Sequence, residues 1–169
     1  MVLDGKRSSS ICCFDYGNAG TSGTGEGNGT IEALYWGSST QWSRGGGSGP
    51  WVAADLENGM FEGDSTNTPS NTSVNFAYVT AMLKGPSGNL FGLKAGDAQS
   101  GTLEIKWNGA RPLGYSPMNK QGAIILGTTG DGSNYGKGTF FEGAITIGSP
   151  SDATDDAVQA NIVAAGYGK

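Results

Sequence analysis

The sequence predicts an all-β protein, a β-sandwich or jelly roll with one short helix at its C-terminus. Three observations support this fold class. Glycine accounts for 31 of the 169 residues and charged residues for only 15%, which is typical of a chain rich in turns. Several segments alternate apolar and polar side chains with the two-residue period of a half-buried strand. Helical spacing of apolar residues occurs in one segment, close to the C-terminus.

The alternation is clearest in residues 102–108. Leu103, Ile105 and Trp107 are expected on one face of this strand, which buries Trp107, and the polar residues between them on the other face. The same pattern predicts six further strands, which span residues 30–36, 51–57, 74–83, 89–94, 123–126 and 139–147. Gly-, Ser-, Asn- and Pro-rich connectors separate them at residues 17–29, 45–50, 63–72, 84–88 and 128–138.

The C-terminal helix has start and stop signals. Ser151 or Asp152 can cap its N-terminus, and Gly166 can end it. Asp155 and Asp156 lie in the first turn, where the helix dipole favours negative charge. The apolar positions that we expect to face the sheet are Val158, Ile162 and Ala165.

Length and charge limit the classes of function. The chain fits one domain, residues 1–169, which can bury roughly two thirds of the surface of its unfolded chain. Its net charge is -5 and it has no basic cluster, so nucleic acid and anionic membranes are poor partners. No apolar run approaches the roughly 20 residues of a membrane span, and no export signal follows Met1. We expect a soluble chain.

Carboxylates must carry any acid or base chemistry, because the chain contains no histidine. This excludes Ser-His-Asp and Cys-His catalysis and imidazole zinc sites. Asp55 and Glu57 lie two residues apart at the end of a predicted strand and therefore on one face, where their titrations would couple. Such a pair suits work on glycosides. A solvent-facing polar strand explains the same pattern.

Other candidate residues lie in or near loops. Asp131 sits in a glycine-rich loop after strand 123–126; it is either a functional carboxylate, an ordinary turn residue or part of a calcium site of lectin type. Adjacent Cys12 and Cys13 are either buried thiols or a disulfide that closes almost no loop and forms a rigid apolar patch. Trp42 precedes a glycine-rich loop, where burial is hard to arrange. Sequons begin at Asn28 and Asn71.

Five motifs together resemble one enzyme family. They are CCFDYGNA (12–19), GPW (49–51), DLENG (55–59), GAIILG (122–127) and PSDAT (150–154). The chain strongly resembles the C-terminal part of the catalytic domain of glycoside hydrolase family 54, the arabinofuranosidase B type. The similarity runs from residue 2 to residue 167. Lys94 replaces an Arg that is usual in the family.

The resemblance implies a retaining exo-acting α-L-arabinofuranosidase on a sandwich of the lectin-glucanase type. It places the nucleophile on Glu57 and the general acid/base on Asp131. It implies a secreted, monomeric enzyme that acts on arabinan and arabinoxylan without metal or cofactor, and that lacks here both the N-terminal part of the catalytic sandwich and the arabinose-binding domain. It also implies sugar contacts from Asp55, Asn58, Gly130, Trp42 and a vicinal disulfide between Cys12 and Cys13.

A second hypothesis from another class stays open at this point. A non-catalytic carbohydrate-binding module could use Trp42, the cysteine pair and oxygen ligands around Asp131, with calcium. Hydrolysis that requires Glu57 and is insensitive to chelators distinguishes the enzyme from this module.

Overall fold

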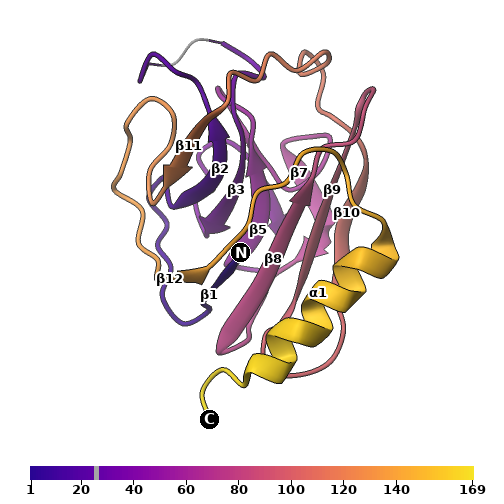
Figure 1. Ribbon diagram of the computed structural model, residues 1–169. Helices are drawn as coiled ribbons and strands as arrows, with labels where there is room; N and C mark the ends of the chain where they lie inside the picture. The colour runs from indigo at the N-terminus through magenta and orange to yellow at the C-terminus, as the bar shows by residue number, and fades with distance from the viewer. Residues whose placement is uncertain (25–26) are drawn as a thin grey trace.

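A computed structural model describes residues 1–24 and 27–169, so residues 25 and 26 of the predicted connector 17–29 lie outside the described residues. Figure 1 shows strands in two facing layers, with a helix beside one of them. In order, the elements are β1 (Val2–Asp4), β2 (Asp15–Ala19), β3 (Glu32–Gly37), β4 (Arg44–Gly46), β5 (Trp51–Asp55), β6 (Met60–Phe61), β7 (Asn67–Thr72), β8 (Tyr78–Lys84), β9 (Leu90–Asp97), β10 (Glu104–Ala110), β11 (Ala123–Leu126), β12 (Phe140–Glu142) and α1 (Asp152–Ala165).

Two antiparallel sheets form the sandwich. We call β10-β9-β8-β1-β12 sheet A and β11-β2-β3-β5-β6 sheet B. A short parallel pair, β4 and β7, forms a third sheet. The predicted all-β sandwich with a single C-terminal helix is therefore confirmed for the described residues.

The two faces of sheet B have different roles, because side chains alternate along each strand. The inner face packs against sheet A and supplies Leu34, Trp36, Val52 and Ala54 to the main core. The outer face carries a smaller apolar cluster made of Cys13, Tyr35, Ala53 and Met60. Asp15, at the start of β2, and Asp55, at the end of β5, lie on that outer face, because Asp15 pairs with Tyr35 and Asp55 follows Ala53 by two residues. Sheet B thus presents buried carboxyl groups away from the main core.

The expected faces of strand 102–108 are wrong at Ile105. The register between β9 and β10 shifts between Ile105 and Trp107, which marks a bulge. Ile105 is 60% exposed, whereas Lys106 is buried and its Nζ contacts Thr72 Oγ1 at 3.2 Å. Trp107 is half-buried and packs against the core, with its ring on Phe91. At the bulge, Trp107 keeps its expected place against the core, whereas Ile105, two residues earlier, faces solvent.

The sequence patterns did not predict several short strands. β1, β4 and β6 have only two or three residues, and β2 overlaps the predicted connector 17–29. β7 lies inside the predicted connector 63–72. The apolar pattern did not predict it, because hydrogen bonds of polar side chains hold this strand in place. Asn71 is fully buried and donates from Nδ2 to the carbonyls of Val52 and Glu62, at 2.9 and 3.0 Å. The Asn71 sequon is therefore inaccessible in the folded chain.

The termini of α1 are as predicted, but its buried face is not. The Ser151 hydroxyl accepts the Thr154 N–H, and Gly166 ends the helix with a φ of 77°. Val158 and Ala165 are exposed. The buried positions are instead Asp155, Gln159 and Ile162. The helix docks on sheet A mainly through polar contacts.

A cluster of ion pairs joins α1 to sheet A. The Nζ atoms of Lys84 on β8 and Lys94 on β9 lie 2.6 and 2.8 Å from Asp155 Oδ2. The same two Nζ atoms lie 3.1 and 2.7 Å from Asp152 Oδ1. Lys94, at the position where the family resemblance leads us to expect Arg, thus anchors the helix. No helix in the described part of the chain has the length and apolar character required to cross a membrane.

Candidate active site

A cavity of about 220 Å³ opens beside the end of β5, and the loop that follows β11 forms one of its walls. Four segments build it: the residues before β2, the loop after β3, the β5–β6 turn and the loop after β11. It is lined by Ile11, Cys12, Cys13, Gln41, Trp42, Asp55, Glu57, Asn58, Gly59, Met60, Thr129, Asp131, Ser133 and Tyr135. All of the sequence-predicted site residues except Gly130 are in this lining.

The β5–β6 turn positions Glu57. The strand ends at Asp55, two residues earlier than predicted, and the Leu56 N–H donates to the Gly59 carbonyl at 3.0 Å. Glu57 and Asn58 are the two central residues, with φ of 64° and 56°. This is the left-handed conformation of a type I′ hairpin turn, which Gly, Asn and Asp favour and Glu does not. Such backbone strain at a non-glycine residue is typical of functional sites.

Asp55 anchors the turn and is almost wholly enclosed. It is 4% exposed, and its Oδ1 accepts the Glu57 N–H at 3.0 Å. Burial raises the pKa of Asp55 above its ordinary value, while hydrogen bonds from the Glu57 N–H, Asp15 and Thr129 partly oppose that rise. The Asp55 and Glu57 side chains both reach the cavity, although only Asp55 belongs to the strand.

Asp131 comes to the cavity from the loop after β11. Its side chain is exposed, and its Oδ1 accepts the Ser133 N–H at 2.8 Å. The neighbouring Gly130 packs against Glu57, because a Cβ at position 130 would lie 3.5 Å from Glu57 Oε2 and would collide with Ile31. Gly130 therefore lies behind the wall rather than in it. Only a residue without a side chain allows this approach of the loop to Glu57.

Sulfur atoms and an indole ring form the apolar part of the wall. Cys12 and Cys13 are joined by a disulfide, and each Sγ lies 3.7 Å from Met60 Sδ. Trp42 is 44% exposed at the cavity. Of the two alternatives for the cysteines, the structure therefore contains the bonded pair.

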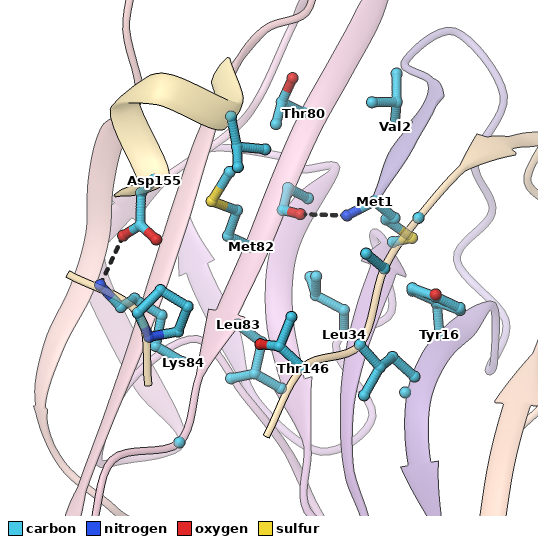
Figure 2. Close-up of a pocket in the computed structure, with 18 of the residues that line it drawn as sticks. Met1, Val2, Tyr16, Leu34, Thr80, Met82, Leu83, Lys84, Thr146 and Asp155 are labelled. Atoms are coloured by element: carbon cyan, nitrogen blue, oxygen red, sulfur yellow. Dashed lines mark hydrogen bonds and ion pairs between the residues drawn. The ribbon is translucent and has the colours of Figure 1, made fainter. Parts of the chain in front are cut away.

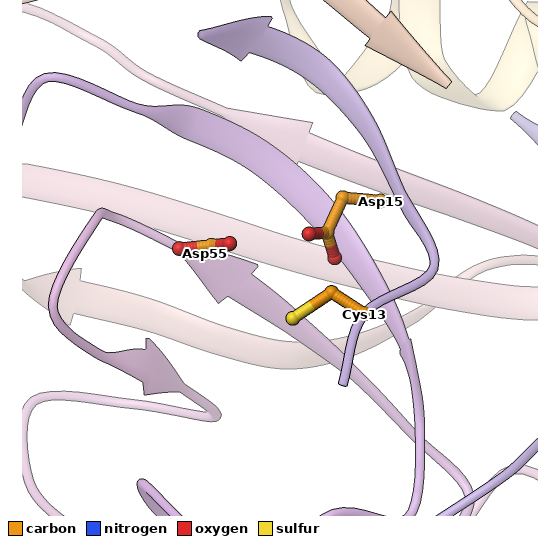
Figure 3. A group of neighbouring side chains, drawn as sticks. All are labelled: Cys13, Asp15 and Asp55. Atoms are coloured by element: carbon orange, nitrogen blue, oxygen red, sulfur yellow. The ribbon is translucent and has the colours of Figure 1, made fainter. Parts of the chain in front are cut away.

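Sequence reasoning missed Asp15. It lies on β2 and is 0% exposed. One of its carboxyl oxygens, a carboxyl oxygen of Asp55 and Cys13 Sγ all lie within 4.8 Å of one another. Figure 3 shows Asp15 and Asp55 reaching toward the same space from two strands of sheet B. Other lining residues not singled out are Ile11, Gln41, Gly59, Met60, Thr129, Ser133 and Tyr135.

A second, larger cavity of about 610 Å³ lies between β8, the segment after β12 and α1 (Figure 2). Its lining is largely apolar, and its charged groups have partners. Met1 donates its amino group to the Ala81 carbonyl at 2.7 Å, Lys84 contacts Asp155, and Glu32 pairs with Arg111 and Lys120. The smaller cavity, in contrast, collects carboxyl groups.

The smaller cavity has the parts of a glycosidase site. Glu57 from a turn and Asp131 from a loop line one hollow, beside the buried Asp55. Two carboxyl groups that flank a glycosidic bond are what most glycoside hydrolases use. Within the described residues, the cluster with metal-ligand spacing is Cys13, Asp15 and Asp55, which does not include Asp131. Because Cys13 is in a disulfide, it offers no thiolate to a metal.

Comparison with known proteins gives a consistent result. Residues 1–168 match the family described as alpha-L-arabinofuranosidase B, catalytic. The chain is 54% identical to alpha-L-arabinofuranosidase B of Aspergillus oryzae and 54% identical to an arabinofuranosidase/B-xylosidase of Trichoderma koningii, each over 98% of this chain. These alignments cover 33% and 34% of the relatives, so the chain spans about a third of their length.

Solved structures agree in fold. A crystal structure of an arabinofuranosidase complexed with arabinofuranosyl-alpha-1,2-xylobiose has a TM-score of 0.94 and 48% identity, over 97% of this chain and 34% of that one. A family 54 α-L-arabinofuranosidase soaked with a cyclic sulfate inhibitor has a TM-score of 0.94 and 49% identity over the same shares.

Proposed function

Because the chain belongs to the family of alpha-L-arabinofuranosidase B catalytic domains, we propose that it removes terminal α-L-arabinofuranosyl groups from arabinan and arabinoxylan with retention of configuration. The observation that carries this proposal is the meeting of Glu57 and Asp131 at one small cavity. The related structure with a bound arabinofuranosyl-xylobiose supports the substrate class. The sequence-based function and the site geometry therefore agree.

The proposed reaction has two steps. Glu57, ionised, attacks the anomeric carbon, while Asp131 gives its proton to the glycosidic oxygen and the C–O bond breaks. Asp131 then takes a proton from water, whose oxygen attacks the same carbon and releases Glu57 and arabinose. Retention requires the two carboxyl groups to lie about 5 to 5.5 Å apart. The exposed loop position of Asp131 suits proton exchange with water between the steps.

The other lining residues would hold the sugar. Asp55 and Asn58 supply polar atoms beside Glu57, and Gly130 brings its backbone close to the same carboxyl. The Cys12–Cys13 disulfide and Trp42 supply apolar surface for the faces of the ring. A volume of about 220 Å³ is below the roughly 300 to 1,000 Å³ of ordinary ligand sites, which favours one terminal furanose over a bound chain.

The remaining parts of the proposal concern context. We expect residues 1–169 to act as one domain of a secreted, monomeric enzyme, with carbohydrate rather than nucleic acid or membrane as its partner. The net charge of -5 is consistent with this expectation. We expect no metal requirement, since the proposed steps use carboxyl groups alone.

The test compares two substrates and three variants. On 4-nitrophenyl α-L-arabinofuranoside and on an arabinoxylan oligosaccharide, Glu57→Gln should abolish turnover of both. Asp131→Asn should lose roughly 10²- to 10⁴-fold on the oligosaccharide and less on the nitrophenyl substrate, whose leaving group needs little protonation. Asp64→Asn, which changes an exposed carboxylate outside the cavity, is the matched control. Full activity in Glu57→Gln would refute the assignment.

A binding module is the competing function, and the exposed Trp42 beside an apolar disulfide wall is the feature that favours it. Arabinose or arabino-oligosaccharide binding by calorimetry, without release of sugar, would support the module. Binding lost in a chelator would add the calcium requirement of that hypothesis. Hydrolysis that survives the chelator supports the enzyme.

A further inference from the structure

The buried carboxyl of Asp15 has no role in the two steps above. It is 0% exposed on the outer face of sheet B, and it lies under the cavity rather than in its lining. No N–H or O–H of a described residue donates to either of its side-chain oxygens. A buried carboxylate without donors is costly, whereas a protonated carboxyl in the same place is not.

Asp55 supplies the missing partner. An oxygen atom of each carboxyl group lies within 4.8 Å of the other, and a hydrogen bond between the two groups requires one of them to carry a proton. Asp55 already accepts the Glu57 N–H at 3.0 Å and a hydrogen bond from Thr129, both of which favour its ionised form. Asp15 has no such support. The proton therefore belongs on Asp15.

The electrostatic surroundings point the same way. Burial raises the pKa of Asp15 well above its ordinary value, and the charges of Asp55 and Asp131 raise it further. Tyr35, which pairs with Asp15 on the adjacent strand, has its own pKa raised further above its ordinary value by burial, and stays neutral. The remaining neighbour, Cys13, is in a disulfide and does not titrate.

We propose that Asp15 is a positioning residue, protonated in the working enzyme, which donates a hydrogen bond to Asp55 and holds that carboxylate in place for a substrate hydroxyl. A carboxylate has about four acceptor positions. The Glu57 N–H, Thr129 and Asp15 occupy three of them, which leaves one directed at the sugar. Asp55 in turn anchors the backbone N–H of Glu57. This inference rests on the proposed arabinofuranosidase function.

The test uses three variants of the full chain. Asp15→Asn keeps a donor of the same shape and should retain kcat/KM within about threefold. Asp15→Leu removes the donor to a charged acceptor and should lose roughly ten- to hundredfold in kcat/KM, mainly through KM. Glu62→Gln, a change at another buried carboxyl that does not line the cavity, is the control and should behave as wild type.

Two further measurements separate positioning from a merely structural role. If Asp15 is neutral in the wild type, Asp15→Asn should leave both limbs of the pH profile of kcat/KM unchanged. A shift of the alkaline limb to lower pH would show that the substitution removed a negative charge, and it would refute the proposal.

Infrared spectroscopy at neutral pH should show a protonated carboxyl band that Asp15→Asn lacks and Glu62→Gln keeps. If the spectra of wild type and Asp15→Asn do not differ in this band, the proposal for Asp15 is wrong. This measurement does not need hydrolysis, so it separates a failure of the Asp15 proposal from a failure of the proposed function. Equal losses in Asp15→Asn and Asp15→Leu, both folded by circular dichroism, would also refute it.

Discussion

Two aspartates in the first turn of α1 contact the same pair of lysines and differ mainly in burial. The side chain of Asp155 is 5% exposed and that of Asp152 is 76% exposed, while the Nζ–Oδ distances are 2.6 and 2.8 Å for Asp155 and 3.1 and 2.7 Å for Asp152. Each aspartate is changed to asparagine, which keeps the size and removes the charge. The comparison isolates what burial contributes to an ion pair, because both changes weaken the helix dipole interaction alike.

Asp155→Asn leaves two lysine side chains, 14% and 10% exposed, without their buried counter-ion. Breaking such a pair costs about 3 kcal/mol of unfolding free energy. For a chain of this length that loss lowers the thermal midpoint by about 6 to 12 °C. Asp152→Asn should lower it far less, since water screens an exposed carboxylate.

Urea unfolding followed by circular dichroism measures both variants, and the unfolding slope should match wild type. The measurement is repeated at about 1 M salt, where the Debye length is about 3 Å and exposed pairs are screened. The loss in Asp155→Asn should persist there. Equal losses in the two variants, or a loss in Asp155→Asn that disappears at high salt, would refute the reasoning.

Three other measurements test separate features. The free energy of unfolding should fall as the pH rises above about 4, because folded Asp15 keeps a proton that the unfolded chain releases; Asp15→Asn should show a shallower fall, and an identical slope would contradict the raised pKa. Asn71→Ala should cost about 2 to 3 kcal/mol, because two buried carbonyls lose their donor, whereas Asn67→Ala, at an exposed position of β7, should be near neutral by urea titration. Mass spectrometry should show a gain of two hydrogen atoms when the Cys12–Cys13 bond is reduced, with a small change in thermal midpoint because the bond closes almost no loop; a large drop in midpoint would show that the bond supports the fold.

Elements with a regular period could be predicted from the sequence, and elements held by individual hydrogen bonds could not. The helix from Asp152 to Ala165 was predictable because its cap and stop residues act locally. The face that it buries was not, because Asp155 is paired with lysines that belong to distant strands. The predicted face of Ile105 in β10 was wrong, since no residue near it signals the bulge.

The candidate site could likewise be predicted only in part. Residues that the family resemblance singled out, such as Glu57, Asp131 and Trp42, line one cavity. The strand before Glu57 was predicted two residues too long, because the structure ends β5 at Asp55 and centres the turn on Glu57-Asn58. Asp15 was missed because its neighbours in space come from other strands, and a single strand does not reveal which groups lie across the sheet.

The two-residue turn between β5 and β6 limits how this site can be redesigned. Its length is tied to the pairing of Asp55 with Met60, so one inserted residue would rotate the attacking group away from the hollow and break the ladder at once. The segments around Trp42 and Asp131 belong to longer loops outside the sheet ladders. New specificity should therefore be sought by remodelling those loops, with the hairpin left as a fixed reference point.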